Sequence, residues 1–139
     1  MKHLMVREDG LAMAGMQRQM SDAVGNAVHR VANVTAGAST LVAGKDIVPG
    51  AILVRTGPTI GYTDTLPTGT QLDTAFAAQY AIGESFMMRS ASHVAFIQTI
   101  AAAAGITLVA GSLTAVGANA VAQFIFTRTA VNTWTYEQI

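Results

Sequence analysis

The sequence contains no cysteine among its 139 residues. This absence excludes disulfide bonds, thiolate nucleophiles and zinc sites with thiolate ligands. Charge is also scarce, because Asp, Glu, Lys and Arg together make up only 12% of the chain, about half of the usual share. Basic and acidic residues balance at eight each, so the chain lacks the excess of Lys and Arg that nucleic-acid binding requires.

Hydrophobic residues are plentiful, at 51% of the sequence, and a chain of this length can bury a core of its own. The composition therefore predicts a folded body rather than a disordered chain. So few charges leave the surface poorly protected against association, since charge keeps soluble proteins apart. We expect the chain to assemble, either with copies of itself or with a partner.

Two features bear on targeting and on membranes. Arg7, Glu8 and Asp9 interrupt the N-terminus before a long apolar run develops, so we expect no signal peptide. Residues 90–127 contain no charged side chain, but polar residues and glycines divide them into short β-like runs. We therefore expect no membrane-spanning helix and no membrane partner.

Residues 1–46 differ in character from the rest of the chain, being rich in Ala, Gly, Met and Val. Apolar residues recur here at intervals of three and four, which is a helical periodicity; they are Met13, Met16, Met20, Val24 and Val28. This stripe has too few apolar neighbours to form its own core. We predict an N-terminal arm, partly helical, that becomes ordered by docking. The alternative is an ordinary N-terminal helix packed against its own domain.

Residues 47–139 have the pattern of a compact, mainly β domain. Short apolar runs recur about every 8–12 residues and end at turn-forming residues. Strands are expected at 51–56, 85–90, 95–100, 106–109, 121–128 and 131–136. Residues 63–70 indicate a polar loop, and Leu72, Phe76 and Tyr80 share one face of a short helix capped by Thr70. The pattern predicts a small antiparallel β-sandwich or barrel, jelly-roll-like, with one short helix.

The sequence shows no catalytic constellation, and we expect the chain not to be an enzyme. His3, His29 and His93 lie far apart without ligand spacing, so we expect no metal, no cofactor and no small-molecule substrate. Asp64 and Asp73 come closest to a pair of carboxylates. Asp64 is expected in a Thr-rich turn and Asp73 in the first turn of the helix, where acidic residues favour the dipole, so we do not interpret them as catalytic.

Two aromatic residues share one face of the last predicted strand, Trp134 and Tyr136. The preceding strand places Phe124 and Phe126 together in the same way. Such a pair is typical of a core or of a subunit interface, and we predict that Trp134 is buried in the body or at an interface. The alternative is an exposed platform that stacks on sugar rings.

Five segments follow one another in a distinctive order: ILVRTGPT at 52–59, YTDTLPT at 62–68, GESF at 83–86, AGITL at 104–108 and ANAV at 118–121. Arg89 follows the third of them. In order and spacing these segments resemble a pattern in small virion proteins of tailed bacteriophages. The resemblance covers roughly residues 47–136, about two thirds of the chain. Each segment consists of turn and strand residues, so the order and spacing are what support the resemblance.

The resemblance implies a head decoration, or cement, protein, which binds the outer surface of a phage capsid and stabilises it. Such proteins commonly form trimers, and many join a β-sandwich or barrel body to an N-terminal arm. It therefore implies the major capsid protein as partner, a homotrimer, and a place on the virion after synthesis in the cytoplasm of the bacterial host. The alternative is a phage fibre or a receptor- or glycan-binding module. The apolar pattern, rather than the resemblance, gives the expected capsid or subunit contacts: Met13, Met16, Met20, Val24, Val28, Trp134 and Tyr136.

Overall fold

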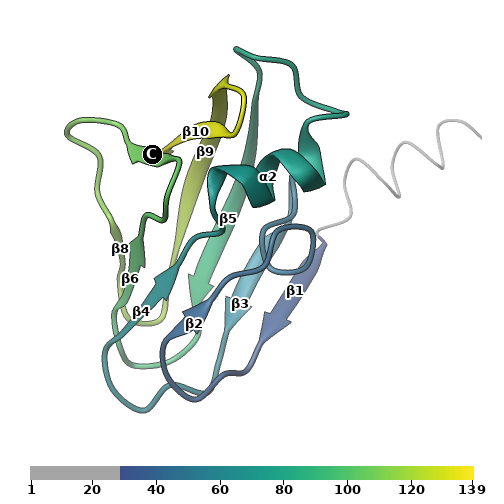
Figure 1. The fold of residues 1–139 in the computed structure, drawn as a ribbon. Helices are drawn as coiled ribbons and strands as arrows, with labels where there is room; N and C mark the ends of the chain where they lie inside the picture. Colours follow the sequence, from purple (N-terminus) through teal and green to yellow (C-terminus); the bar gives the residue numbers. More distant parts are fainter. Residues whose placement is uncertain (1–28) are drawn as a thin grey trace, which may run out of the picture.

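The computed structural model describes residues 29–139, which form two mixed β-sheets and one short helix (Figure 1). The six-stranded sheet contains, in spatial order, β1 (Arg30–Asn33), β3 (Ile52–Arg55), β5 (Ser85–Ser92), β9 (Ala120–Ala130), β10 (Thr133–Gln138) and β7 (Ile106–Leu108). The four-stranded sheet contains β2 (Ser39–Thr40), β4 (Tyr62–Thr65), β6 (Gln98–Ala101) and β8 (Ala115–Val116). The prediction of a small, mainly β sandwich with one short helix is confirmed.

The described strands alternate between the two sheets from β1 to β9, so the chain winds around a common core (Figure 1). Strands two apart in the sequence consequently pair in parallel, β1 with β3 and β3 with β5 in one sheet, β2 with β4 and β4 with β6 in the other. Strand β9 ends this winding by pairing antiparallel with both β5 and β10. The predicted antiparallel, jelly-roll-like pairing is therefore corrected to a mixed one.

The core lies between the inner faces of the two sheets. The six-stranded sheet contributes the alternate, inward-facing residues of its central strands, including Phe86, Met88, Phe124 and Phe126. The rings of Phe86 and Phe126 stack with centroids 5.1 Å apart. At full burial such aromatic side chains contribute about 1.5–3 kcal/mol each, so this cluster is a main source of stability.

Helix α2 (Gly69–Phe76) covers one end of the core with Leu72 and Phe76. Its N-cap is Thr68, whose hydroxyl accepts from the Gln71 N–H while the Gln71 side chain accepts from the Thr68 N–H. The predicted cap at Thr70 was therefore two residues late, because the Thr68/Gln71 pair forms the capping box. No helix within residues 29–139 is long and apolar enough to cross a membrane.

The described fold begins earlier in the chain than the predicted arm boundary at residue 46. Strands β1 and β2 belong to the sheets, and Leu41 is buried in the core. Both strands are short and carry polar residues, so they lack the apolar alternation that reveals a strand in a sequence. The predicted contact residues Met13, Met16, Met20, Val24 and Val28 lie outside the described residues.

Candidate functional site

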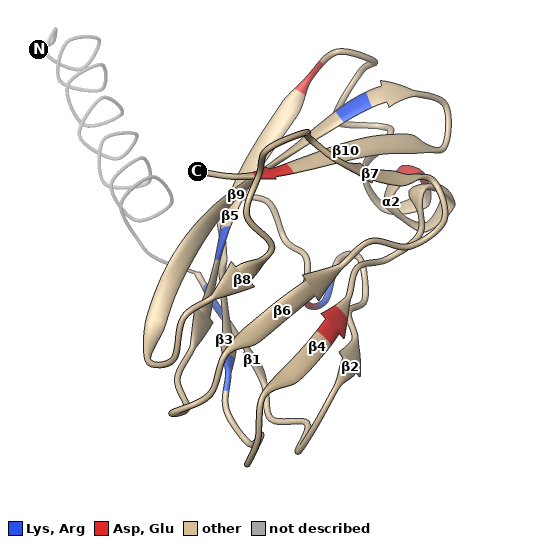
Figure 2. Cartoon of the chain, turned by 90° about the vertical axis from the view of Figure 1, so that its left-hand side faces the viewer, with Lys and Arg blue, Asp and Glu red and all other residues tan. Residues whose placement is uncertain are grey.

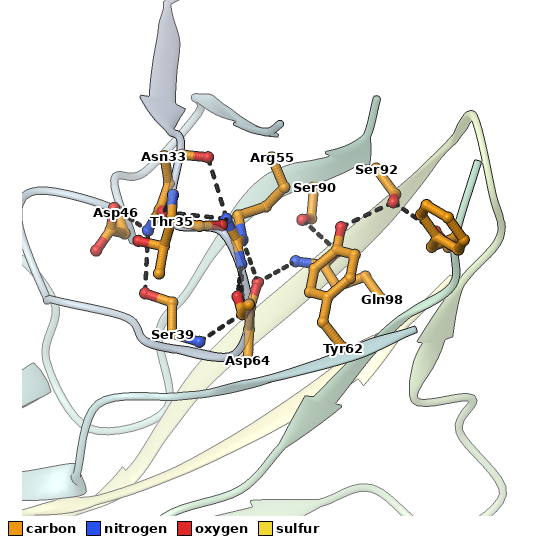
Figure 3. Close-up of polar contacts among 12 residues, drawn as sticks. Asn33, Thr35, Ser39, Asp46, Arg55, Tyr62, Asp64, Ser90, Ser92 and Gln98 are labelled. Atoms are coloured by element: carbon orange, nitrogen blue, oxygen red, sulfur yellow. Dashed lines mark hydrogen bonds and ion pairs between the residues drawn. The ribbon is translucent and has the colours of Figure 1, made fainter. Parts of the chain in front are cut away.

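A buried polar cluster joins the two sheets and centres on Arg55 and Asp64 (Figure 3). Arg55 ends β3 in one sheet, and Asp64 lies in β4 of the other. The Arg55 Nε lies 2.6 Å from Asp64 Oδ2, and Nη2 lies 3.1 Å from Oδ1. Both side chains are fully buried, so this is a two-point ion pair held away from water.

The remaining donors of Arg55 are directed to the connection between β1 and β2. Nη1 donates to the Asn33 carbonyl, the Asn33 side-chain oxygen and the Thr35 carbonyl. Nη2 donates to the Gly37 carbonyl over 2.6 Å. A guanidinium has five N–H donors in a fixed planar arrangement, and here each of its three nitrogens has a partner. Arg55 therefore holds the first strand connection in place from the inside.

The carboxylate of Asp64 is satisfied as completely as the guanidinium. Besides the two contacts from Arg55, it accepts from the Ser39 N–H at 3.0 Å and from Gln98 Nε2 at 2.8 Å. Gln98 in turn accepts from the Ser90 hydroxyl at 2.7 Å. These contacts link β2, β4, β5 and β6, so a single carboxylate fixes how strands of the two sheets face each other.

Two further pairs extend the cluster at its edges. Asp46 accepts from Asn33 Nδ2 at 3.2 Å and from the Val42 N–H at 2.8 Å. The Tyr62 hydroxyl lies 2.7 Å from the Ser92 hydroxyl, and the Arg55 guanidinium lies 4.8 Å from the centre of the Tyr62 ring. Burial raises the pKa of Tyr62 above its ordinary value of 10.0. Tyr62 is therefore a neutral hydrogen-bonding partner at physiological pH.

The chemistry of this cluster is that of a structural joint. A general base or nucleophile must reach a substrate, but Asp64 is fully buried and its carboxylate already accepts four hydrogen bonds. A nearby cavity of about 10 Å³ lies among apolar residues that include Leu53, Met88 and Phe126. Ligand pockets measure about 300–1,000 Å³, so this cavity is far too small to hold a substrate.

A second cluster surrounds Asp73 on helix α2. Its carboxylate accepts from Arg128 Nε at 3.0 Å and Nη2 at 2.8 Å, from the Asn132 N–H at 2.7 Å and from Trp134 Nε1 at 2.7 Å. The hydrogen bonds from Arg128, helped by those from Asn132 and Trp134, lower the pKa of Asp73 to about 2. Asp73 thus fastens the helix to the β9–β10 hairpin.

The two acidic residues that the sequence brought together as a possible pair belong to separate clusters, each with its own arginine. Asp64 lies in strand β4 rather than in a turn, and Asp73 lies past the first turn of α2 because the helix begins at Gly69. Of the histidines, His29 and His93 are exposed, and His3 lies outside the described residues. Within residues 29–139 no group of three His, Cys, Asp or Glu residues is arranged to hold a metal ion.

Trp134 and Tyr136 share an inward-facing side of β10 and are buried, at 0% and 1% exposure. The prediction that Trp134 is buried in the body is confirmed. Its indole donates to Asp73, and the Tyr136 hydroxyl donates to the Ile100 carbonyl at 3.3 Å. Neither ring can stack on a sugar or contact a capsid, so their assignment as interface residues is corrected: both are core residues.

Charged residues are few along the described fold (Figure 2). Ten large apolar side chains are instead exposed on it: Val34, Val42, Ile60, Ile82, Met87, Ile97, Leu113, Val121, Val131 and Ile139. Sequence reasoning anticipated a surface of this kind from the composition. It missed the Arg55 and Asp64 joint, whose only signal is an Arg inside the apolar run ILVR and an Asp inside the alternating segment YTDT.

The sequence matches no known family profile and no curated protein.

Proposed function

We propose that this chain is a structural virion protein that binds the outer surface of a phage capsid and stabilises it. The observation that carries the proposal is the surface of the described fold, which exposes ten large apolar side chains and only four charged ones. Where exposed apolar side chains gather in contiguous patches, they mark a surface that another protein covers. The resemblance of residues 47–136 to small phage virion proteins supports the same function.

The two buried clusters fit a structural role. Arg55 and Asp64 connect strands of both sheets, and Asp73 fastens the helix to a hairpin. Each of these charged groups is hydrogen-bonded inside the described fold, where it holds neighbouring elements rigidly together. Rigidity is suited to a decoration protein, because a rigid protein loses little conformational entropy when it binds the capsid.

In this proposal the partner is the major capsid protein, and the chain acts as a homotrimer that contacts several capsid subunits at once. Three modest contacts on one trimer then act together, because the second and third form at high effective concentration. A protein that binds only the assembled capsid stabilises it by mass action. The gain is about 2.7 kcal/mol per site at a hundredfold excess over Kd.

The test uses empty, expanded capsids assembled from the major capsid protein encoded in the same genome. The purified chain should sediment with them and raise their melting temperature. Salt should weaken this binding only slightly, because the net charge is zero. A shortened chain that starts at residue 29 keeps every described strand and tests what residues 1–28 contribute. Failure of the full chain to bind these capsids, or binding without any gain in their melting temperature, would contradict the proposal.

A further inference from the structure

Four strand connections gather at one end of the sandwich, which we call the loop end; they are residues 34–38, 56–61, 93–97 and 117–119 (Figure 1). The parallel strands β1, β3 and β5 finish there, whereas β2, β4 and β6 begin there. Strand β9 also begins there, because it pairs antiparallel with β5, so the β9–β10 turn lies at the opposite end. A backbone hydrogen bond of 3.0 Å from Asn119 to Val94 joins the last connection to the third.

The loop end exposes three large apolar side chains, Val34, Ile60 and Ile97, at 71%, 70% and 52% exposure. Their connections lie against one another, since Gly57 packs so closely on the Val34 carbonyl that a Cβ would collide with it. Gly61, which follows Ile60, lies beside the Ile97 carbonyl. The three apolar side chains therefore lie on adjoining loops.

Charge is absent from the loop end. None of its four connections contains Asp, Glu, Lys or Arg, and His93 is its single titratable side chain. Within residues 29–139 the exposed charged residues all lie outside it: Arg30, Lys45, Glu84 and Arg89. A charged partner surface would lose hydration here without gaining a counter-charge, so the loop end fits an uncharged, apolar surface.

Hydrogen bonds from inside the fold fix these connections in place. Arg55 donates to the Thr35 carbonyl at 3.0 Å and to the Gly37 carbonyl at 2.6 Å. The Ser92 hydroxyl donates to the Phe96 carbonyl at 2.8 Å. A surface that is already ordered loses little conformational entropy on binding, so the buried cluster around Arg55 prepares the loop end for a partner.

We propose that the loop end is the surface with which this chain binds the capsid, and that it packs on an uncharged, apolar patch of the major capsid protein. This inference rests on the proposed function and adds the contact surface to it. The four connections contain fewer residues than the roughly 20–30 that each partner contributes to a standard interface. One copy should therefore bind weakly, and the three loop ends of a trimer should bind strongly together.

A second copy of the chain is the competing occupant. In a cyclic trimer each subunit contact joins two different patches, and the rotation axis turns all three loop ends the same way along it. Exposed apolar residues outside the loop end, including Met87 and Leu113, leave other surfaces for the subunit contacts. In this arrangement the loop ends stay free for a partner that all three reach at once.

Two matched double variants of the full chain test the proposal by co-sedimentation with empty, expanded capsids. Val34→Asp/Ile60→Asp places charges in the loop end and should raise the Kd for capsids at least tenfold. Ile82→Asp/Val131→Asp makes the same change at the opposite end, where both side chains are also exposed, and should leave the Kd unchanged. Both variants should keep the wild-type melting temperature and the wild-type mass in light scattering, because all four side chains lie on the surface.

The outcomes separate this inference from the proposed function. If the wild type binds and the loop-end variant binds equally well, the inference is wrong and the proposed function stands. If the wild type itself does not bind, both fail. Loss of the wild-type mass in the loop-end variant would assign the loop end to a contact between copies and overturn the inference.

Protection of an introduced cysteine gives a second measurement, which the absence of native cysteine makes unambiguous. Saturating capsids should slow the reaction of Ile60→Cys with a maleimide several-fold. The reaction of Ile82→Cys should proceed at the same rate with and without capsids. Equal protection of the two cysteines, or protection at position 82 alone, would contradict docking through the loop end.

Discussion

At Arg55 a charged side chain occupies a position where the strand faces the interior. Leu53, two residues earlier on the same side of β3, is an ordinary core residue. The guanidinium is tolerated because Asp64 pairs with it at two points and three backbone carbonyls accept its other hydrogens. Burying such a pair gains little on balance, but removing one partner leaves a buried charge without compensation.

Arg55→Ala should therefore lower the free energy of unfolding by about 3–5 kcal/mol. The exposed Arg89 provides the matched control, and Arg89→Ala should change it by no more than about 0.5 kcal/mol. Urea unfolding followed by tryptophan fluorescence measures both, since Trp134 is the single tryptophan. Equal changes in the free energy of unfolding for the two substitutions would show that the Arg55–Asp64 ion pair contributes no more to stability than an exposed arginine does.

Asp73 makes stability depend on pH in the acidic range. Its pKa falls from 3.8 to about 2 in the folded chain, chiefly through the hydrogen bonds from Arg128. A lowered pKa contributes stability that is fully present above the unfolded value and is lost as pH falls through the folded value. The unfolding free energy should consequently decline between about pH 4 and pH 2. Asp73→Asn should reduce this slope, and an unchanged slope would assign the decline to other carboxyl groups.

At the scale of elements, the tightest contact joins the start of α2, the residues before β7 and the β9–β10 turn. Gly69 and Gly105 both face the Asn132 carbonyl, and a Cβ on Gly105 would lie 2.6 Å from its oxygen. Asn132 itself has a φ of 57°, which Asn tolerates better than most residues. Three segments distant in sequence thus meet through backbone atoms, with no room for a side chain.

Gly69→Ala should destabilise the fold strongly, because its Cβ would collide with the Asn132 backbone, which cannot move without disturbing the turn. Gly37→Ala is the control. Gly37 has nothing within 4 Å of the added Cβ and no positive φ, so this change should be neutral or stabilising by up to about 1 kcal/mol. Thermal melts of both variants measure the difference. A Gly69→Ala melt equal to that of Gly37→Ala would refute the contact.

The elements also show which parts of the fold were predictable. Strands β3, β5, β7, β9 and β10 follow from apolar runs, and each overlaps its expected range. The sequence predicts a loop where strand β4 lies. The inward side of this strand holds Tyr62 and Asp64, and a charged residue at a buried position hides the alternation of apolar and polar residues that indicates a strand. The sequence did not predict the parallel pairing for a different reason. The alternation of polar and apolar residues along a strand indicates which face is buried, but it does not indicate which strand pairs with it.

The candidate site was less predictable than the fold. Trp134 was correctly expected to be buried, but its partner Asp73 lies 61 residues away in the sequence. Arg55 and Asp64 are only nine residues apart, yet nothing in either residue type tells a buried pair from two exposed charges. Such contacts depend on how the strands are brought together, which a single sequence does not display.

For the whole molecule we predict a homotrimer, because within residues 29–139 the ten exposed large apolar side chains outnumber the four exposed charged ones, and charge keeps copies apart. Light scattering at micromolar concentration should give a mass of three times 14.4 kDa. Dilution should shift the mass towards that of one chain, since association depends on concentration. A single 14.4 kDa species at every concentration would contradict self-assembly in the absence of a capsid.

The winding of strands between the sheets determines the order in which the chain can fold as it is synthesised. Strands β1 to β6 can pair with one another as soon as they emerge, since each partner lies two strands earlier. Strand β5 must wait for β9, whose Thr127 pairs with Ser85 only after 42 more residues have been made. Until then β5 exposes an unpaired edge, which is a template for aggregation. Folding should take milliseconds to seconds, as in other proteins with long-range strand pairing, and its yield should fall as nascent chains become crowded.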